Sequence, residues 1–377
     1  MGKKAIVAGH ICIDITPVFP KNTHSVKDLG EIFKPGKLIH MSSADVHTGG
    51  AVANTGLGMK ILGADVRLMG KIGDDAFGGM IQNILKEYHA DDDLLVSKGE
   101  ITSYSVVVAA PGVDRIFLHC PGANDTFDGT EIEDAMLADV ALFHFGYPPI
   151  MKKMYEDGGD HLLALFRKMK EKHIATSLDM AAIDPDSPAG KADWEGILKK
   201  VLPYVDFFVP SFEELCFMLD RSLYESLLKR AGNGDITGLL SVEKEIAPLA
   251  DRCLSLGAKS VLLKCGAPGL YFKASEDMAD VGSRLGLQEA QWNGYCRFEK
   301  SYRIPAVISG TGAGDTSIAA FLTSLLEGET PRNALENAAA AGALCCTAYD
   351  ATSGLKPLEK IREMIDSGWE KADQTEE

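Results

Sequence analysis

A short stretch near the end of the chain, Gly310-Thr311-Gly312-Ala313-Gly314-Asp315, holds the residues best suited to chemistry. Its glycines let backbone N–H groups approach one point, and the helix predicted to follow adds unpaired donors and the positive end of a dipole. This pattern predicts an anion site. A carboxylate beside a bound phosphate would repel it, so Asp315 makes sense if the anion arrives with Mg2+ and the carboxylate removes a proton.

Taken alone, the same stretch has an ordinary explanation. Glycine-rich turns between strands and helices are common, and an aspartate in a first helical turn is a routine cap. Two other groups near the N-terminus bear on the choice, namely Asp14, expected at or just past the C-terminal end of a strand, and Gly49-Gly50 followed by Asn54. Each also has a structural explanation, as a turn aspartate and as small residues that let a helix pack tightly.

The composition narrows the class of protein. The chain has 377 residues, 46% hydrophobic and 24% charged, which suits a large globular core. Lys plus Arg is 38 and Asp plus Glu is 54, so the net charge is 38 − 54 = −16, and a nucleic acid is a poor partner. The eight cysteines lack metal-ligand spacing and read as free thiols, and no apolar stretch approaches a membrane span. We therefore expect a cytoplasmic protein.

The first third of the chain alternates between a main sheet and two β-rich excursions. Residues 4–9 and 65–70 are predicted strands, with a helix from Gly49-Gly50 to Gly63 between them and another ending near Tyr88. Residues 100–109 and 115–120 form a predicted hairpin around Pro111-Gly112-Val113-Asp114. The two excursions, residues 11–47 and 100–125, could together form a small β-sheet lid over a cleft.

From residue 139 onward the alternation is regular, which predicts an α/β fold with a mostly parallel central sheet flanked by helices. We expect one domain over residues 1–370, followed by an acidic tail over 371–377. The predicted strands are 139–145, 174–179, 205–209, 260–265 and 302–308. The predicted helices are 150–172, 190–202, one from Ser211, 243–256, 316–326, 331–349 and 357–368.

Together, these motifs resemble the ribokinase-like (PfkB) family of carbohydrate and nucleoside kinases. The resemblance rests on Gly49-Gly50 with Asn54, Gly122-Ala123-Asn124, Ser211-Phe212-Glu213-Glu214 and Gly312-Ala313-Gly314-Asp315, in that order over nearly the whole chain. It implies an ATP-dependent sugar kinase that uses Mg2+. A P-loop enzyme is excluded because no Gly-Lys-Ser/Thr follows the glycines.

The resemblance also implies roles for single residues. Asp315 would be the catalytic base, with the amides of Gly312, Ala313 and Gly314 stabilising the transferring phosphoryl group. The acceptor would be held by Asp14, Gly49, Gly50 and Asn54. The nucleotide would be bound by Lys264, Gly266, Thr311, Gly312, Gly314 and Asn337. Glu214 would organise Mg2+ and its waters. The lid would cover the sugar, and its open edges could pair two copies of the chain as a homodimer.

Three departures from the family pattern qualify these expectations. Ser211 stands where the family has the Asn of Asn-x-x-Glu, which alters the water network around Mg2+. Ser309 replaces the Asp at the head of the glycine stretch, which counts against a ribokinase-type K+ site. Ala51 replaces the lysine that follows the double glycine in ribokinase, so the substrate pocket is expected to differ.

Other functions stay open at this point. A nucleoside kinase of the same fold would need aromatic walls around a base, for which Phe19, Phe33, Phe117, Phe145 and Tyr147 are available. A non-catalytic sugar- or nucleotide-binding protein is a second alternative. Dinucleotide oxidoreduction is a third and weak one, because the glycine spacing is not Gly-x-Gly-x-x-Gly.

Overall fold

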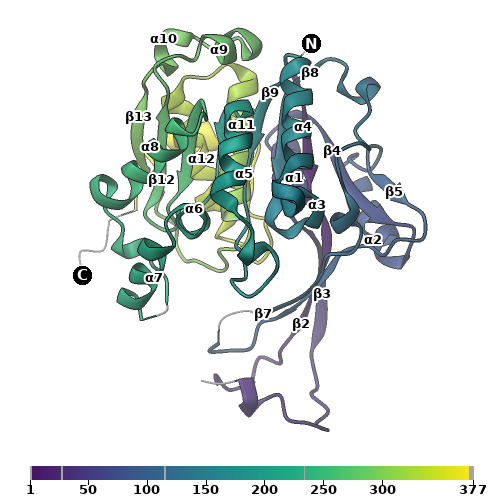
Figure 1. Ribbon diagram of the computed structural model, residues 1–377. Helices are drawn as coiled ribbons and strands as arrows, with labels where there is room; N and C mark the ends of the chain where they lie inside the picture. The colour runs from purple at the N-terminus through teal and green to yellow at the C-terminus, as the bar shows by residue number, and fades with distance from the viewer. Residues whose placement is uncertain (1, 27–28, 114–115, 233, 373–377) are drawn as a thin grey trace.

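The computed structural model describes residues 2–26, 29–113, 116–232 and 234–372. Asp114 and Arg115 of the predicted hairpin and residues 373–377 of the predicted tail lie outside the described residues. Figure 1 shows a body of helices around a large sheet, from which a smaller sheet projects. In the described part of the chain, no helix combines the length and apolar character needed to span a membrane.

The large sheet has nine strands among the described residues, and its pairings are parallel except at one edge, where β12 pairs antiparallel with both β11 and β13. This confirms the predicted mostly parallel sheet. In spatial order the strands are β13 (Cys296–Lys300), β12 (Gly269–Ala274), β11 (Ser260–Lys264), β10 (Phe207–Phe208), β9 (Ala175–Leu178), β8 (Val140–Gly146), β1 (Lys4–Gly9), β4 (Asp65–Gly73) and β5 (Leu95–Ser97).

Apolar residues are buried on both faces of this sheet. Successive side chains of a strand point to opposite sides, so a central strand contributes to a buried cluster on each face. Ala5 and Val7 of β1 belong to one buried cluster, whereas Ile6 and Ala8 belong to the other. The first cluster includes α1 (Ala51–Ile61), α2 (Ala76–Lys86), α9 (Ala279–Leu285), α10 (Glu289–Trp292), α11 (Ala313–Glu327), α12 (Pro331–Cys345) and α13 (Leu358–Asp366). The second includes α3 (Lys152–Tyr155), α4 (Asp160–Glu171), α5 (Trp194–Val201), α6 (Phe212–Leu219), α7 (Arg221–Arg230) and α8 (Ala247–Ser255).

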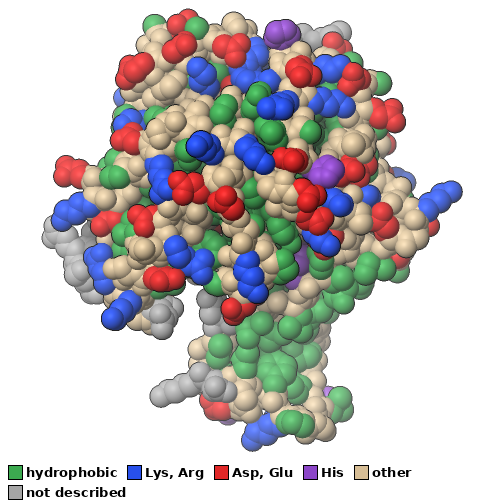
Figure 2. Space-filling view, in the orientation of Figure 1, with side chains coloured by type: hydrophobic (Ala, Val, Ile, Leu, Met, Phe, Trp, Pro, Cys, Tyr) green, Lys and Arg blue, Asp and Glu red, His purple; other side chains and the backbone are tan. Residues whose placement is uncertain are grey.

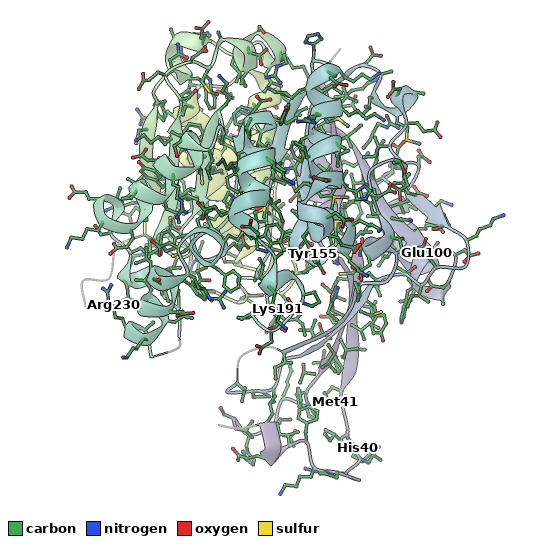
Figure 3. All side chains as sticks on the ribbon, in the orientation of Figure 1. His40, Met41, Glu100, Tyr155, Lys191 and Arg230 are labelled. Atoms are coloured by element: carbon green, nitrogen blue, oxygen red, sulfur yellow. The ribbon has the colours of Figure 1, made fainter. Side chains whose placement is uncertain are left out.

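The small sheet is built from the two predicted excursions. Its four described strands are ordered β3 (Ser43–Gly49), β2 (Cys12–Val18), β6 (Tyr104–Val108) and β7 (Ile116–Cys120). The segment with His40 and Met41 lies at the end farthest from the large sheet (Figure 3). Because β1 runs almost directly into β2 and β3 into α1, the small sheet is tied to the edge where the large sheet meets α1.

The structure corrects three expectations. The helix predicted over 150–172 is two helices, α3 and α4, because Gly158 and Gly159 adopt left-handed φ values of 65° and 76° between them. Residues 302–308 are not a strand, since Pro305 lacks an N–H donor and the exposed Val307 borders a cavity rather than a core. Asp14 lies within β2, well beyond the end of β1.

The chain end also differs from the predicted acidic tail. Lys371 forms a β-bridge with Tyr302, and the Ala372 N–H donates to the Ser301 carbonyl at 2.8 Å. Residues 371 and 372 therefore pack on the body of the protein instead of extending into solvent.

Candidate active site

The glycine stretch forms a helix start. Gly312 caps α11 with a left-handed φ of 77°, a conformation that glycine adopts without strain. The first helical hydrogen bond runs from the Thr316 N–H to the Gly312 carbonyl at 2.9 Å. The Ala313 N–H donates to the Gly310 carbonyl at 3.3 Å, so by helix geometry the amides of Gly314 and Asp315 form the positive end of α11. The positive end of the helix therefore lies further along the chain than the amides of Gly312, Ala313 and Gly314, to which the resemblance assigns the phosphoryl group.

Asp315 is buried at that helix start, with only 4% of its surface exposed. Its carboxylate accepts hydrogen bonds from Asn54 Nδ2 at 3.0 Å and Thr55 Oγ1 at 3.4 Å, and Tyr147 Oη lies 2.8 Å from both carboxylate oxygens. Burial raises the pKa of Asp315, while the nearby Lys264 ammonium and the hydrogen bonds from Asn54 and Tyr147 oppose the rise. A buried carboxylate with a raised pKa and fixed donors is suited to taking a proton.

Lys264 brings a positive charge beside this carboxylate from the end of β11. Its Nζ donates to Asp179 Oδ1 at 2.5 Å, and its stem passes the helix start, since a Cβ on Gly314 would lie 3.2 Å from Lys264 Cδ. Burial alone would lower the pKa of Lys264, but the charges of Asp179, Glu214 and Asp315 raise it. Lys264 therefore remains an ammonium among three carboxylates.

Asp179 follows β9 and is fully buried. Burial raises its pKa, and Glu214 and Asp315 add to the rise, while the ion pair with Lys264 opposes it. Its second oxygen, Oδ2, has no hydrogen-bond partner among the described residues. An unpaired buried carboxylate oxygen is costly, so this atom indicates a place where a ligand or its metal could bind.

Glu214, the predicted metal residue, lies in the first turn of α6. Its Oε2 accepts the Ser211 N–H at 2.8 Å, and its own N–H donates to Ser211 Oγ at 3.2 Å. The pair is a capping box. Ser211, which departs from the family pattern, thus has a structural role at the helix start, and one oxygen of Glu214 is engaged in the cap.

A cavity of about 600 Å3 opens at the start of α11. Of the residues assigned to the nucleotide from sequence, Lys264, Gly266 and Gly314 line it, together with Ala313. Thr311 and Gly312 lie in the adjoining turn, outside the lining set. The remaining walls are mostly small or apolar, and include Leu270, Tyr302, Ile304, Val307, Ala339 and Ala343.

Asn337 is not brought to this cavity. It is 1% exposed, and its Nδ2 donates to Ser324 Oγ of α11 at 3.0 Å. Ala339, Gly342, Ala343 and Cys346 line the cavity at helical spacing, and residue 337 lies on a different side of α12.

The predicted acceptor residues lie where the small sheet joins the large one. A Cβ on Gly49 would lie 2.1 Å from Asp14 Oδ2, and one on Gly50 would lie 2.5 Å from His10 Nδ1. The two glycines therefore make room for protein side chains, whereas the sequence interpretation gave that space to a ligand. Cys12 Sγ lies 3.3 Å from Asp14 Oδ1, and burial raises the pKa of Asp14.

His10 and Asp179 are candidate site residues that the sequence interpretation missed, and Tyr147 was considered there only as an aromatic wall for a nucleoside base. Burial, with a contribution from His119, lowers the pKa of His10 to about 3, and neither ring nitrogen has a hydrogen-bond partner among the described residues. Tyr147 and Asp179 follow directly on β8 and β9, at the carboxyl edge where ligands of such sheets bind. That position is the signal that could have identified them.

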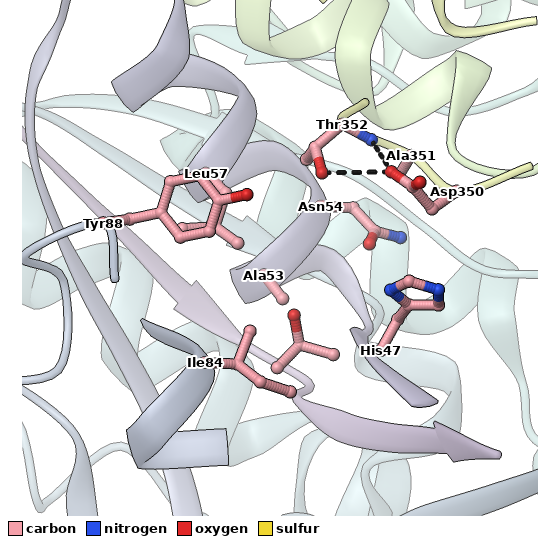
Figure 4. A pocket seen from close by; sticks show the side chains of 10 residues that line it. His47, Ala53, Asn54, Leu57, Ile84, Tyr88, Asp350, Ala351 and Thr352 are labelled. Carbon is pink, nitrogen blue, oxygen red and sulfur yellow. Dashed lines mark hydrogen bonds between the residues drawn. The ribbon is translucent and has the colours of Figure 1, made fainter. Parts of the chain in front are cut away.

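A second cavity of about 60 Å3 lies against Asn54 (Figure 4). Its walls include His47, Thr48, Leu57, Tyr88 and Asp350, from β3, α1, the end of α2 and the loop after α12. It is far smaller than the roughly 300 Å3 of an ordinary small-molecule pocket.

The aromatic residues considered for a nucleoside base are not gathered around Asp315. Phe145 is buried against Phe127 and Phe143, and Phe33 and Phe117 are exposed. Tyr147 alone among them contacts the carboxylate.

The chain is similar to known carbohydrate kinases. The family model described as pfkB family carbohydrate kinase matches residues 3–357. The chain is 24% identical to Fructokinase-2 of Zea mays over 84% of each chain. It is 23% identical to the 2-dehydro-3-deoxygluconokinase of Bacillus subtilis, over 88% of this chain and 90% of that one.

Solved structures share the fold. The ribokinase of Arabidopsis thaliana, complexed with ribose and ATP, superposes with a TM-score of 0.71 at 20% identity, covering 97% of this chain and 99% of that one. The nucleoside kinase of Methanocaldococcus jannaschii gives a TM-score of 0.65 at 18% identity, covering 97% and 100%. The chain belongs to the pfkB family of carbohydrate kinases, phosphotransferases that act on an alcohol group.

Proposed function

We propose that the protein transfers the γ-phosphoryl group of ATP to a hydroxyl of a small carbohydrate, with Asp315 as the general base. The observation that carries the proposal is the position of Asp315. It is buried at the start of α11, bound to Asn54 and Tyr147 on one side and close to the Lys264 charge on the other. A base that must take a proton next to an incoming phosphate needs such surroundings.

The cavity at the start of α11 suits a nucleotide. Its volume of about 600 Å3 lies within the usual range for small-molecule sites. Lys264 and the first-turn amides of α11 would take the phosphates, because a helix N-terminus and an ammonium both attract anions. The apolar walls would take the base.

The residues present also fit Mg2+. Glu214 has one carboxylate oxygen outside its capping bond, and Asp179 Oδ2 is buried without a partner among the described residues. Hard oxygen ligands, held directly or through waters, are those that Mg2+ prefers. When bound with the nucleotide, the ion would neutralise phosphate charge during transfer.

The chain's own groups would then act in sequence. Asn54 and Tyr147 hold the Asp315 carboxylate toward the acceptor, and Asp315 takes the proton of the acceptor hydroxyl. The acceptor oxygen forms a bond to the γ-phosphorus as the bond to the β–γ bridging oxygen breaks, and ADP leaves with that electron pair. Lys264 and the amides of Gly314 and Asp315 stabilise the negative charge of the transferring group.

A carbohydrate is the acceptor class that we favour. Asp14, Asn54 and His10 are polar groups at or beside the junction of the two sheets, and they can pair with several hydroxyls. Phe145 and Phe117 are directed to the core and to the surface, which supports a sugar over a nucleoside.

The proposal is tested with a panel of sugars and nucleosides, with turnover followed by coupled detection of ADP. We expect turnover with a sugar and not with a nucleoside. Because Ser309 supplies no carboxylate and bonds to Thr311, we also expect turnover without K+.

The Asp315→Asn variant tests the base. It should lower kcat by about two to four decades while ATP binding, followed by calorimetry, is unchanged. Unchanged turnover in this variant would contradict the assigned mechanism and would favour a different base.

We further propose a homodimer formed through the small sheet. Ile116, Phe117 and Leu118 of β7 are 41%, 53% and 58% exposed, on a strand that has a partner on one side only among the described strands. Hydrophobic side chains gather on this projecting sheet in Figure 2. An exposed apolar edge strand favours pairing with a second copy. Phe117→Lys should shift the sedimentation of the protein to that of a monomer.

A further inference from the structure

The last described residues, 369–372, lie beside residues 301–303. The Arg303 N–H donates to the Glu370 carbonyl at 2.9 Å, and the Ala372 N–H donates to the Ser301 carbonyl at 2.8 Å. Tyr302 and Lys371 form an antiparallel bridge between these bonds. The C-terminal segment, as we call residues 369–372, therefore holds the backbone of residues 301–303 on one side.

Side chains strengthen this attachment. The Trp369 ring lies 4.7 Å from the Tyr302 ring, centroid to centroid, and Lys371 Nζ lies 3.2 Å from the Tyr302 ring centroid. Trp369 Nε1 also donates to the Arg303 carbonyl at 2.6 Å. Lys371 forms an ion pair with the buried Glu299 of β13. The Tyr302 ring is thus contacted by two side chains of the C-terminal segment.

The same residues form a wall of the 600 Å3 cavity. Ser301, Tyr302, Arg303 and Ile304 line it, and so does Ala372 of the C-terminal segment itself. The family model matches residues 3–357, so the C-terminal segment lies outside the matched residues. This wall of the cavity is therefore formed jointly by residues 301–304 and the C-terminal segment.

We propose that the C-terminal segment is part of the donor site and sets the affinity for the donor nucleotide. Ala372 contributes surface directly, and Trp369 and Lys371 hold residues 301–304 in place. Since Lys264 and the start of α11 supply the charged groups, the Tyr302 and Ile304 wall suits the flat, weakly charged base. This inference rests on the proposed use of ATP.

The experiment compares three chains, namely the full protein, a chain ending after Ala372 and a chain ending after Gly368. ATP with Mg2+ is titrated by calorimetry, and KM and kcat are measured with the sugar found in the panel. The chain ending after Ala372 should match the full protein. The chain ending after Gly368 should bind ATP about tenfold more weakly and show a KM for ATP raised by the same factor, with kcat and the KM for the sugar changed less than about twofold. Equal ATP affinity in all three chains would overturn the inference.

A point variant covers the case in which the shorter chain fails to fold. Ala372→Trp adds volume to the cavity wall and should weaken ATP binding by a similar factor. Its control, Glu359→Trp, adds the same side chain at an exposed position of α13 and should not. If Ala372→Trp leaves ATP affinity unchanged, the segment does not border the bound nucleotide. If the full protein binds no ATP at all, the proposed donor is wrong and the inference falls with it.

Discussion

The two sides of the site are built differently. The proposed donor side is a cavity of about 600 Å3, in which we assign the phosphates to Lys264 and the backbone amides of α11. The acceptor side is filled by side chains from β1, β2, α1 and the turn after β8, which contact each other closely. Asp14 lies against Gly49, His10 lies against Gly50, and Asn54 and Tyr147 bind Asp315.

We infer from this difference that the choice of sugar can vary more readily among such kinases than the binding of the nucleotide phosphates. We assign the phosphates to one lysine and to backbone amides, and backbone amides do not depend on residue type. A site made of touching side chains changes its substrate when one of them changes. Substitution of Lys264 should therefore lower the rate, and substitution in the apolar walls of the cavity should weaken ATP binding. Substitution on the acceptor side should weaken binding of the sugar.

The largest effect is expected on the donor side. Lys264→Met keeps the apolar stem and removes the charge that faces Asp179 and Asp315. We expect kcat to fall about 100-fold, because a cation next to the transferring phosphoryl group is lost. Stopped-assay measurement of kcat at saturating ATP and sugar checks this.

Stability provides the control for this variant. Removing one partner of a buried ion pair costs about 3–5 kcal/mol, so Lys264→Met should also unfold at lower urea concentration. Adding Asp179→Asn removes the stranded charge and should restore stability without restoring kcat. Recovery of both would mean that Lys264 serves only to neutralise Asp179.

On the acceptor side, Gly49→Ala should raise the KM for the sugar about tenfold and leave the KM for ATP unchanged. The added Cβ would lie 2.1 Å from Asp14 Oδ2, so the carboxylate must move. Gly79→Ala is the matched control, since a Cβ there meets nothing within 4 Å. A rise in the KM for ATP would contradict the separation of the two sides.

The pH dependence of kcat/KM links the two sides through Asp315. The base is active when ionised, and burial raises its pKa, so the rate should fall as pH decreases through that raised value. Lys264 opposes the rise, so Lys264→Met should move this acid limb to higher pH. Lys360→Met, on the exposed face of α13, should leave the limb in place. If the acid limb does not move in Lys264→Met, the charge of Lys264 does not influence the pKa of Asp315.

The smallest effect is expected at Asn337. Asn337→Ala should leave ATP affinity unchanged, because this side chain binds Ser324 outside the cavity. It should lower the free energy of unfolding by about 1 kcal/mol, as Ser324 loses a buried partner. Calorimetric ATP titration and urea unfolding measure the two quantities. A weakened ATP affinity would mean that Asn337 contributes to nucleotide binding after all.

Much of the fold follows from local patterns in the sequence. Apolar runs predict the buried parallel strands, and glycines mark the start of α1 and α11. The sequence around β12 and β13 lacks the regular alternation of strands and helices. Residues 302–308 are predicted as a strand because apolar residues that border a cavity have the same composition as a core strand. Composition cannot separate these two cases.

The part of the candidate site that backbone geometry forms could be predicted from the sequence. Asp315, Asn54, Lys264 and Gly314 come together as the motifs predict. Tyr147, Asp179 and His10 reach the site through the tertiary arrangement of β8, β9 and β1, on which no local motif bears. A sequence pattern also does not indicate the direction in which a single side chain points, and Asn337 is an example.

Tyr147 carries a consequence for how the base is prepared. Its φ of 69° is a left-handed value that costs a bulky residue roughly 1–3 kcal/mol, and Pro148 and Pro149 follow it, which restricts the backbone further. The Tyr147 hydroxyl that bonds to Asp315 therefore belongs to a segment with few alternative conformations. We infer that Asp315 is preorganised, so that little reorientation of its dipolar surroundings accompanies the reaction. Identical Tyr147 torsions in crystals grown with and without nucleotide would support this, and a change of rotamer would refute it.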